Sequence, residues 1–170
     1  LEFVDGASDV TLDSTYDEYM FVFTDINPAT DAADFTFQVN ATDGADYNDS
    51  AITSTVFRAY HRENDNNASL DYVTGEDQAQ GTAFQILASA IGNDADQSCA
   101  GELHLFNPAS TTYVKHFYAR MSRYFPSGSG DGAGDHFAAG YINDTTAIDE
   151  IQFKFSSGNF DGVIQMYGIS

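Results

Sequence analysis

The clearest hydrophobic pattern lies in the segment EIQFKF, residues 150–155. Ile151, Phe153 and Phe155 alternate there with polar residues, and DFTFQVN (34–40) repeats the alternation. A period of two residues places the apolar side chains on one face of a β-strand and the polar side chains on the other. The pattern therefore predicts strands that bury one face against a core.

Similar segments recur along the chain, separated by turns rich in Asn, Asp, Gly and Ser. The best helical candidate, 76–90, carries Gly81 in its middle, and no segment sustains a 3.6-residue apolar period. Many short strands with turn signals between them predict an all-β fold: an antiparallel β-sandwich with jelly-roll-like connections. The predicted strands are 18–26, 34–40, 53–61, 84–92, 101–107, 112–121, 136–143, 150–158 and 162–169.

The connections 40–50, 62–78, 92–98 and 126–135 are acidic or glycine-rich, so we expect loops there and a mobile tip at the last of them. No repeat or linker divides the sequence, which predicts a single domain over 1–170. The chain begins at Leu1 without a methionine. That leaves open that the domain is the C-terminal part of a longer chain.

Charge narrows the classes of partner. The chain of 170 residues carries 26 acidic and 6 basic residues, for a formal net charge of −20. Nucleic acid and anionic membrane surfaces are poor partners for such a chain. Salt screens a field of this kind, so the composition suits an extracellular, salty setting. The sequence has no apolar run of about 18 residues that would predict a membrane span.

Catalytic and metal motifs are scarce in the sequence. One cysteine, Cys99, excludes an internal disulfide and a multi-cysteine zinc site, and HExxH, GxSxG and SxxK patterns do not occur. His104 and His116 fall on adjacent predicted strands and could face each other across a hairpin, although strand histidines more often satisfy a local hydrogen bond. We therefore expect a protein that is not an enzyme.

Calcium is the one cofactor for which the acidic loops offer suitable ligands, because this cation prefers hard oxygen atoms. An EF-hand loop needs Gly at its sixth position. Cys99 occupies that position when counted from Asp94, and Leu70 when counted from Asp65. Neither loop fits, so we expect no bound metal and favour solvated turns.

Aromatic residues beside the loops are candidates for contact with sugars, because their rings offer flat apolar faces. Packing in the core or in a subunit interface is the alternative role for each of them. These loop aromatics are Tyr47, Tyr72, Tyr124 and Phe125.

The segment HLFNPASTTYVKHFYARM, residues 104–121, reads as a strand, a turn and a second strand. Pro108 fixes φ in the turn, and Asn107 can bond to the local backbone. The basic residues of this region form the main counter-charge of an acidic chain, and we expect them to contact an acidic neighbouring subunit. They are Lys115, Arg120 and Arg123.

Five stretches covering nearly the whole chain resemble a family of structural proteins from tailed bacteriophages that is common in marine phage genomes. These are DSTYDEYMFVFTDINPATDAADFTFQV (13–39), FRAYHRE (57–63), DQAQGT (77–82), HLFNPASTTYVKHF (104–117) and GYINDTTAIDEIQFKFSSGNFDGVIQMYG (140–168).

The resemblance implies a structural protein on the virion exterior, either a capsid decoration or a tail-fibre domain. It implies coat or tail subunits as partners, assembly as a homo-oligomer with the trimer as the first expectation, and no catalytic residue. A carbohydrate-binding module that recognises a host-surface glycan, with or without calcium, is the alternative function.

Overall fold

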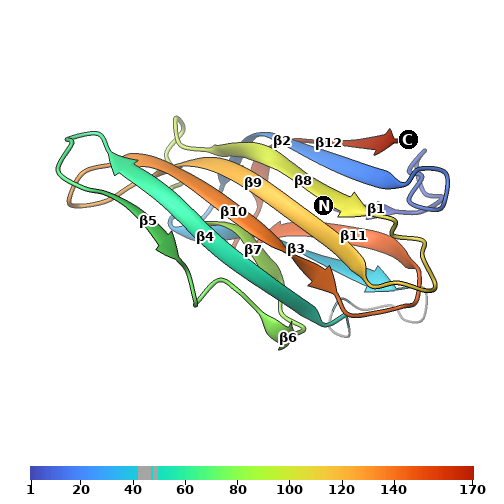
Figure 1. The fold of residues 1–170 in the computed structure, drawn as a ribbon. Coiled ribbons are helices and arrows are strands. Elements are labelled where there is room, and N and C mark those ends of the chain that lie inside the picture. The colour runs from blue at the N-terminus through green and yellow to red at the C-terminus, as the bar shows by residue number, and fades with distance from the viewer. Residues whose placement is uncertain (42–46, 48–49) are drawn as a thin grey trace.

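A computed structural model of the chain describes residues 1–41, 47 and 50–170. The described part consists of β-strands joined by turns and loops (Figure 1). The strands are β1 (Glu2–Val4), β2 (Glu18–Pro28), β3 (Ala33–Ala41), β4 (Ile52–Arg62), β5 (Ala68–Tyr72), β6 (Ala79–Gly81), β7 (Gln85–Ile91), β8 (Cys99–Phe106), β9 (Lys115–Phe125), β10 (Gly132–Ile142), β11 (Ile148–Phe155) and β12 (Phe160–Ile169).

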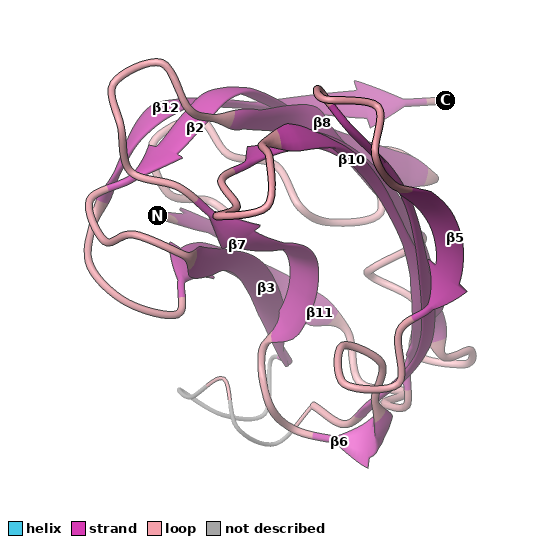
Figure 2. Cartoon of the chain, turned by 90° about the vertical axis from the view of Figure 1, so that its left-hand side faces the viewer, coloured by secondary structure: helices cyan, strands magenta, loops and turns pink. Residues whose placement is uncertain are grey.

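The strands form two antiparallel sheets that pack face to face. The larger, eight-stranded sheet has the order β12-β2-β8-β9-β10-β4-β5, with β6 also paired to β4. The smaller sheet has four strands in the order β1-β11-β3-β7. Figure 2 shows the larger sheet curving around the smaller one. One face of the larger sheet therefore covers the core, and the other faces outward.

Phenylalanine side chains from both sheets fill the core. Phe153 of β11 lies at its centre, with ring centroids 5.2 Å from Phe21 and 5.1 Å from Phe23 on the opposing strand β2. Its ring also lies 6.1 Å from Phe35 and 6.4 Å from Phe37, both on the adjacent strand β3. All five side chains are buried. The alternation read from 34–40 and 150–155 thus identified the face that joins the two sheets.

The predicted β-sandwich is confirmed, and each of the nine predicted strands is present with shifted ends. The jelly-roll-like connectivity is not confirmed. The strands β1, β5 and β6 were not predicted. The Asn and Asp content of 62–78 predicted a loop, but Ala68–Tyr72 pairs with β4. Pairing to a long neighbouring strand outweighs the weak local preference of such a short segment.

The expected loop at 126–135 is shorter than predicted, because β10 begins at Gly132. Gly132 and Gly134 pack against side chains of the neighbouring strand β9. A Cβ atom added at Gly132 would lie 2.8 Å from Phe125 Cζ, and one added at Gly134 would lie 3.1 Å from Arg123 Nε. These glycines thus allow close approach within the sheet.

Candidate functional site

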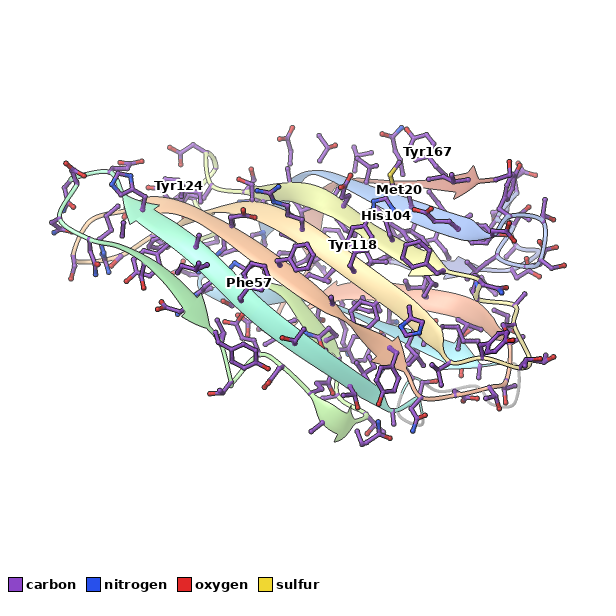
Figure 3. All side chains as sticks on the ribbon, viewed as in Figure 1. Met20, Phe57, His104, Tyr118, Tyr124 and Tyr167 are labelled. Carbon is purple, nitrogen blue, oxygen red and sulfur yellow. The ribbon has the colours of Figure 1, made fainter. Side chains whose placement is uncertain are left out.

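The outer face of the eight-stranded sheet carries a row of large apolar side chains that crosses six strands. Direct strand partners join Tyr118 to His104, His104 to Met20, and Met20 to Tyr167. On the other side of Tyr118 the row continues through Phe137 of β10 and Phe57 of β4, which are partners in their turn. Figure 3 shows this outer face, and we call the six residues Phe57, Phe137, Tyr118, His104, Met20 and Tyr167 the outer row.

The rings of the outer row stack on one another. His104 and Tyr118 have ring centroids 4.5 Å apart with planes 15° apart, and Phe57 and Phe137 are 5.0 Å and 20° apart. Tyr118 and Phe137 complete the series at 6.2 Å and 7°. Nearly parallel rings at these distances stack on one another with a lateral offset. Neighbours in the row therefore cover part of the ring faces of Tyr118 and Phe137.

The row remains accessible from outside. Phe57 is 42% exposed and Tyr167 is 44% exposed, and Leu70, Tyr72 and Val163 on the same face are also exposed. These five are the majority of the eight large hydrophobic side chains that are exposed in the described part of the chain. An exposed apolar area that gathers on one face is typical of a contact surface.

His104 links the row to two carboxylates. Its Nδ1 bonds to Glu18 Oε1, and its Nε2 lies 3.6 Å from Glu102 Oε1 without a hydrogen bond. Burial raises the pKa of Tyr118, and the charges of Glu18 and Glu102 raise it further. The row therefore combines apolar rings with a flanking negative charge.

A shallow hollow of about 500 Å³ adjoins the row and offers polar groups. Arg120 and Asp135 form a two-point ion pair there, with Nη2 2.7 Å from Oδ2 and Nε 3.1 Å from Oδ1. Hydrogen bonding to Asp135, followed by its charge, raises the pKa of Arg120. Glu102 and Ser122 line the same hollow, so it presents donors and acceptors beside an aromatic surface.

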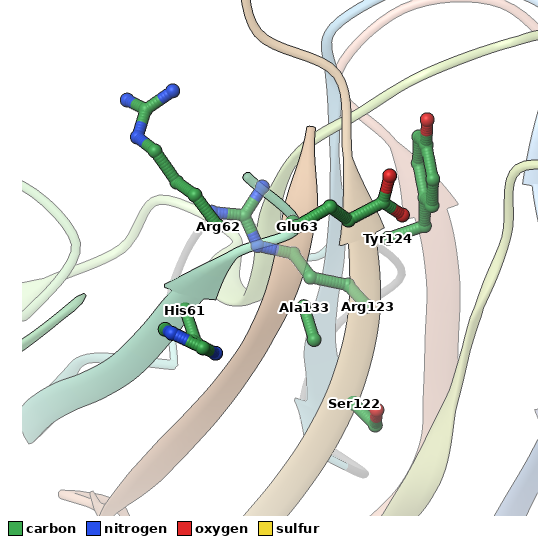
Figure 4. A pocket seen from close by; sticks show the side chains of 8 residues that line it. His61, Arg62, Glu63, Ser122, Arg123, Tyr124 and Ala133 are labelled. Carbon is green, nitrogen blue, oxygen red and sulfur yellow. The ribbon is translucent and has the colours of Figure 1, made fainter. Parts of the chain in front are cut away.

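A second hollow, of about 370 Å³, lies where β4, β9 and β10 meet at one end of the sheet (Figure 4). Tyr124 donates a hydrogen bond to Asp131 Oδ2 at this end, and that bond, followed by burial, raises the pKa of Tyr124 to about 12. The lining residues are His61, Arg62, Glu63, Ser122, Arg123, Tyr124, Gly132 and Ala133.

The structure separates the four predicted sugar-contacting aromatics. Tyr72 and Tyr124 lie on the outer face of the large sheet, whereas Phe125 points to the inner face beside Arg123. Tyr47 lies elsewhere, with its ring 6.2 Å from Phe84, and burial followed by the charge of Glu150 raises its pKa. The four residues do not form one binding face.

The predicted basic cluster is also divided, because successive residues of β9 point to opposite faces. Lys115 is 0% exposed, and its Nζ donates to the carbonyl oxygens of Asp144, at 3.0 Å, and Thr146. Burial lowers the pKa of Lys115, partly offset by the charge of Asp144. Arg123 is buried too, and only Arg120 of the three is exposed on the outer face. Lys115 and Arg123 are therefore corrected from surface contacts to interior groups.

His104 and His116 share the outer face but are not opposite each other. Tyr118 is the direct partner of His104, and Tyr141 is the direct partner of His116. His104 is buried and His116 is exposed. The expectation of a facing histidine pair is wrong, because the β8–β9 register places a tyrosine there.

Among the described residues, no group of three His, Cys, Asp or Glu side chains is arranged to hold a metal ion. The same part of the chain contains no helix that is long and apolar enough to cross a membrane. Cys99 is buried, and burial raises the pKa of its thiol to about 12.

Comparison of the chain with models of known protein families, with curated proteins and with solved structures gives no match.

Proposed function

We propose that this chain is a non-enzymatic structural module on the exterior of a tailed-phage virion. In this proposal it docks onto coat or tail subunits through the outer row of its large sheet. The observation that carries the proposal is the row of large side chains across β4, β10, β9, β8, β2 and β12, which is exposed at both ends, at Phe57 and Tyr167. The resemblance of residues 13–39, 57–63, 77–82, 104–117 and 140–168 to phage structural proteins supports the virion location.

The stacking geometry favours a protein partner over a flat sugar-binding platform. A platform needs ring faces that lie open to the ligand, whereas Tyr118 stacks on His104 on one side and on Phe137 on the other. What remains available is a ridge of ring edges and terminal apolar side chains, which can pack into a complementary protein surface. Assembly as a trimer, on the capsid or as part of a fibre, belongs to the same proposal.

Incorporation into particles tests this function. The phage that encodes the chain is propagated with the double substitution Phe57→Ser and Tyr167→Ser, and copies per particle are counted by quantitative mass spectrometry against the major coat protein. We expect the chain in wild-type particles and a loss of at least about tenfold in the variant, since each buried aromatic anchor contributes strongly to an interface.

Tyr113→Ser is the matched control, because Tyr113 is 71% exposed but lies in the connection between β8 and β9. Absence of the chain from wild-type particles, or full incorporation of the double variant, would contradict the proposal.

Recognition of a host-surface glycan is the second candidate, favoured by the hollow of about 500 Å³ with Glu102, Arg120 and Asp135 beside the row. A glycan array probed with the assembled oligomer, with and without a calcium chelator, tests it. We expect a binding signal that Arg120→Ala removes. No signal in either condition rejects this function.

A further inference from the structure

Three of the four arginines of this chain line one hollow on the inner side of the large sheet. The hollow has a volume of about 270 Å³ and lies between the ends of β4, β5 and β9. Arg58, Arg62 and Arg123 contribute three positive charges, and Asp71 contributes the one carboxylate. In a chain with a net charge of −20, this is a local reversal of sign.

The protein leaves part of each guanidinium unused. Arg58 donates from Nη1 to Glu76 Oε1 at 3.5 Å, Arg62 from Nη1 to Ser127 Oγ at 2.7 Å and Gly130 O at 2.8 Å, and Arg123 from Nη1 to the carbonyl oxygens of Ser89 and Ala90. Within the described residues, no hydrogen bond uses the Nη2 group of any of these arginines. Arg58 Nε and Arg123 Nε are buried and also lack a partner.

Burial and the repulsion between neighbouring guanidinium groups disfavour the charged form of Arg123. Arg123 is 7% exposed, and burial, followed by the charge of Arg58, lowers its pKa to about 10. The guanidinium remains protonated at neutral pH, so the hollow contains incompletely paired positive charge. An oxyanion is the group that relieves this situation, because it accepts several N–H bonds from adjacent guanidinium groups.

The remaining lining suits a ring-shaped ligand. Tyr60 and Phe125 meet edge to face with centroids 5.9 Å apart, and Phe125 lies under the Arg123 guanidinium at 5.0 Å. Ser127 adds a hydroxyl group. Figure 4 shows the Arg62 and Arg123 side chains extending from β4 and β9. At about 270 Å³ the hollow is slightly smaller than the sites of drug-sized ligands, which span about 300–1,000 Å³, so its size suits a ligand as small as a single sugar ring.

We propose that this arginine hollow binds an acidic sugar, with its carboxylate held by Arg58, Arg62 and Arg123 and with Tyr60 and Phe125 as the apolar part of the lining. The site is separate from the outer row, and the inference does not depend on the proposed virion function. Long-range repulsion from the acidic chain opposes anion binding, and it weakens in about 0.15 M salt, where the screening length is about 8 Å.

Titration of the whole chain with galacturonate, followed by amide NMR shifts in about 0.15 M salt, tests the proposal. We expect saturable shifts in residues 58–62 and 123–127 with galacturonate but not with neutral galactose. Arg62→Gln should weaken binding about tenfold, since it removes a charged hydrogen-bond donor. Asp71→Asn should strengthen binding, because it removes the one negative charge in the hollow.

Lys154→Gln is the matched control for charge, because Lys154 is exposed and belongs to β11 of the small sheet. It should bind galacturonate as the unsubstituted chain does. If Arg62→Gln does not fold, the galacturonate affinity of Asp71→Asn still tests the proposal. No saturable binding, equal binding of galactose, shifts confined to other residues, or an affinity unchanged by both Arg62→Gln and Asp71→Asn would overturn the proposal.

Discussion

The two faces of the eight-stranded sheet use aromatic residues in different ways. On the inner face, rings meet those of the small sheet at steep angles, as for Phe23 with Phe153 at 70° and with Phe35 at 82°. On the outer face, rings stack along the sheet, as for Tyr118 with Phe137 at 7°. Inner rings are enclosed by two sheets, whereas outer rings have neighbours only within their own sheet. The inner face thus stabilises the fold, and the outer face stays available for contact.

Charged residues follow the same division. Strand β9 points Lys115 inward to backbone carbonyl oxygens and Arg120 outward to Asp135. Neighbouring positions on one strand therefore have different functions, which depend on the face to which each side chain points.

The largest expected difference between the faces is in stability. Phe153→Ala should lower the free energy of unfolding by about 3–5 kcal/mol, because it opens a cavity among five core rings. Phe57→Ala on the outer row should cost about 1 kcal/mol or less, since it removes one cross-strand contact. Urea unfolding of both variants measures this, and equal losses would remove the distinction between the faces.

A smaller effect is expected at a polar cluster under the inner face. Glu76 lies 3.2 Å from His136 Nε2 and 3.5 Å from Arg58 Nη1, and its side chain is largely buried. Burial raises the pKa of Glu76, but hydrogen bonds with His136 and Ser89 and the charges of His136 and Arg58 bring it below the ordinary 4.5. Glu76→Gln should cost about 3 kcal/mol at neutral pH, because the Arg58 guanidinium loses its charged partner in a largely buried site.

The same linkage gives a pH dependence. Because the folded-state pKa of Glu76 is depressed, its stabilising contribution is present above pH 4.5 and is lost as the pH falls through the folded value. As the pH decreases, the free energy of unfolding should fall less steeply for Glu76→Gln than for the unsubstituted chain. The same pH dependence of the free energy of unfolding in both proteins would show that protonation of Glu76 is not coupled to folding.

The smallest effect is expected at the end of the outer face. Tyr124 has a raised pKa of about 12 against an ordinary value of 10.0. Its contribution to the stability of the folded state is therefore complete below pH 10.0 and is lost as the pH rises toward about 12. Tyr124→Phe should flatten the alkaline loss of stability within that window. Thermal melts of both proteins from neutral to alkaline pH measure this, and identical slopes would contradict the assignment.

Local pattern identified much of the fold but little of the site. The alternation at 34–40 and 150–155 identified the buried face, because a strand's burial is visible in its own sequence. The prediction of a surface contact for Lys115 was wrong, because Lys115 shares the buried face of β9 with Phe117. The carbonyl oxygens of Asp144 and Thr146 that accept its hydrogen bonds come from a distant connection and leave no local signal.

The outer row was missed for a similar reason. Tyr72 and Tyr124 were identified from their places beside loops, and both lie on the outer face. Phe57, His104 and Tyr118 become neighbours only through the order β8-β9-β10-β4, which brings together residues far apart in sequence. Strand order depends on non-local pairing, and single-sequence periodicity does not contain it.

Hydroxyl-radical footprinting of the chain, free and in purified particles, tests the central claim most directly. Aromatic and sulfur-containing side chains label readily, so Met20, Phe57, Tyr118 and Tyr167 report on the outer row, and Tyr113 reports on a surface outside it. We predict strong protection of the four row residues in the particle with Tyr113 labelled equally in both states. Equal labelling of the row in free and assembled protein would contradict its role as the docking surface.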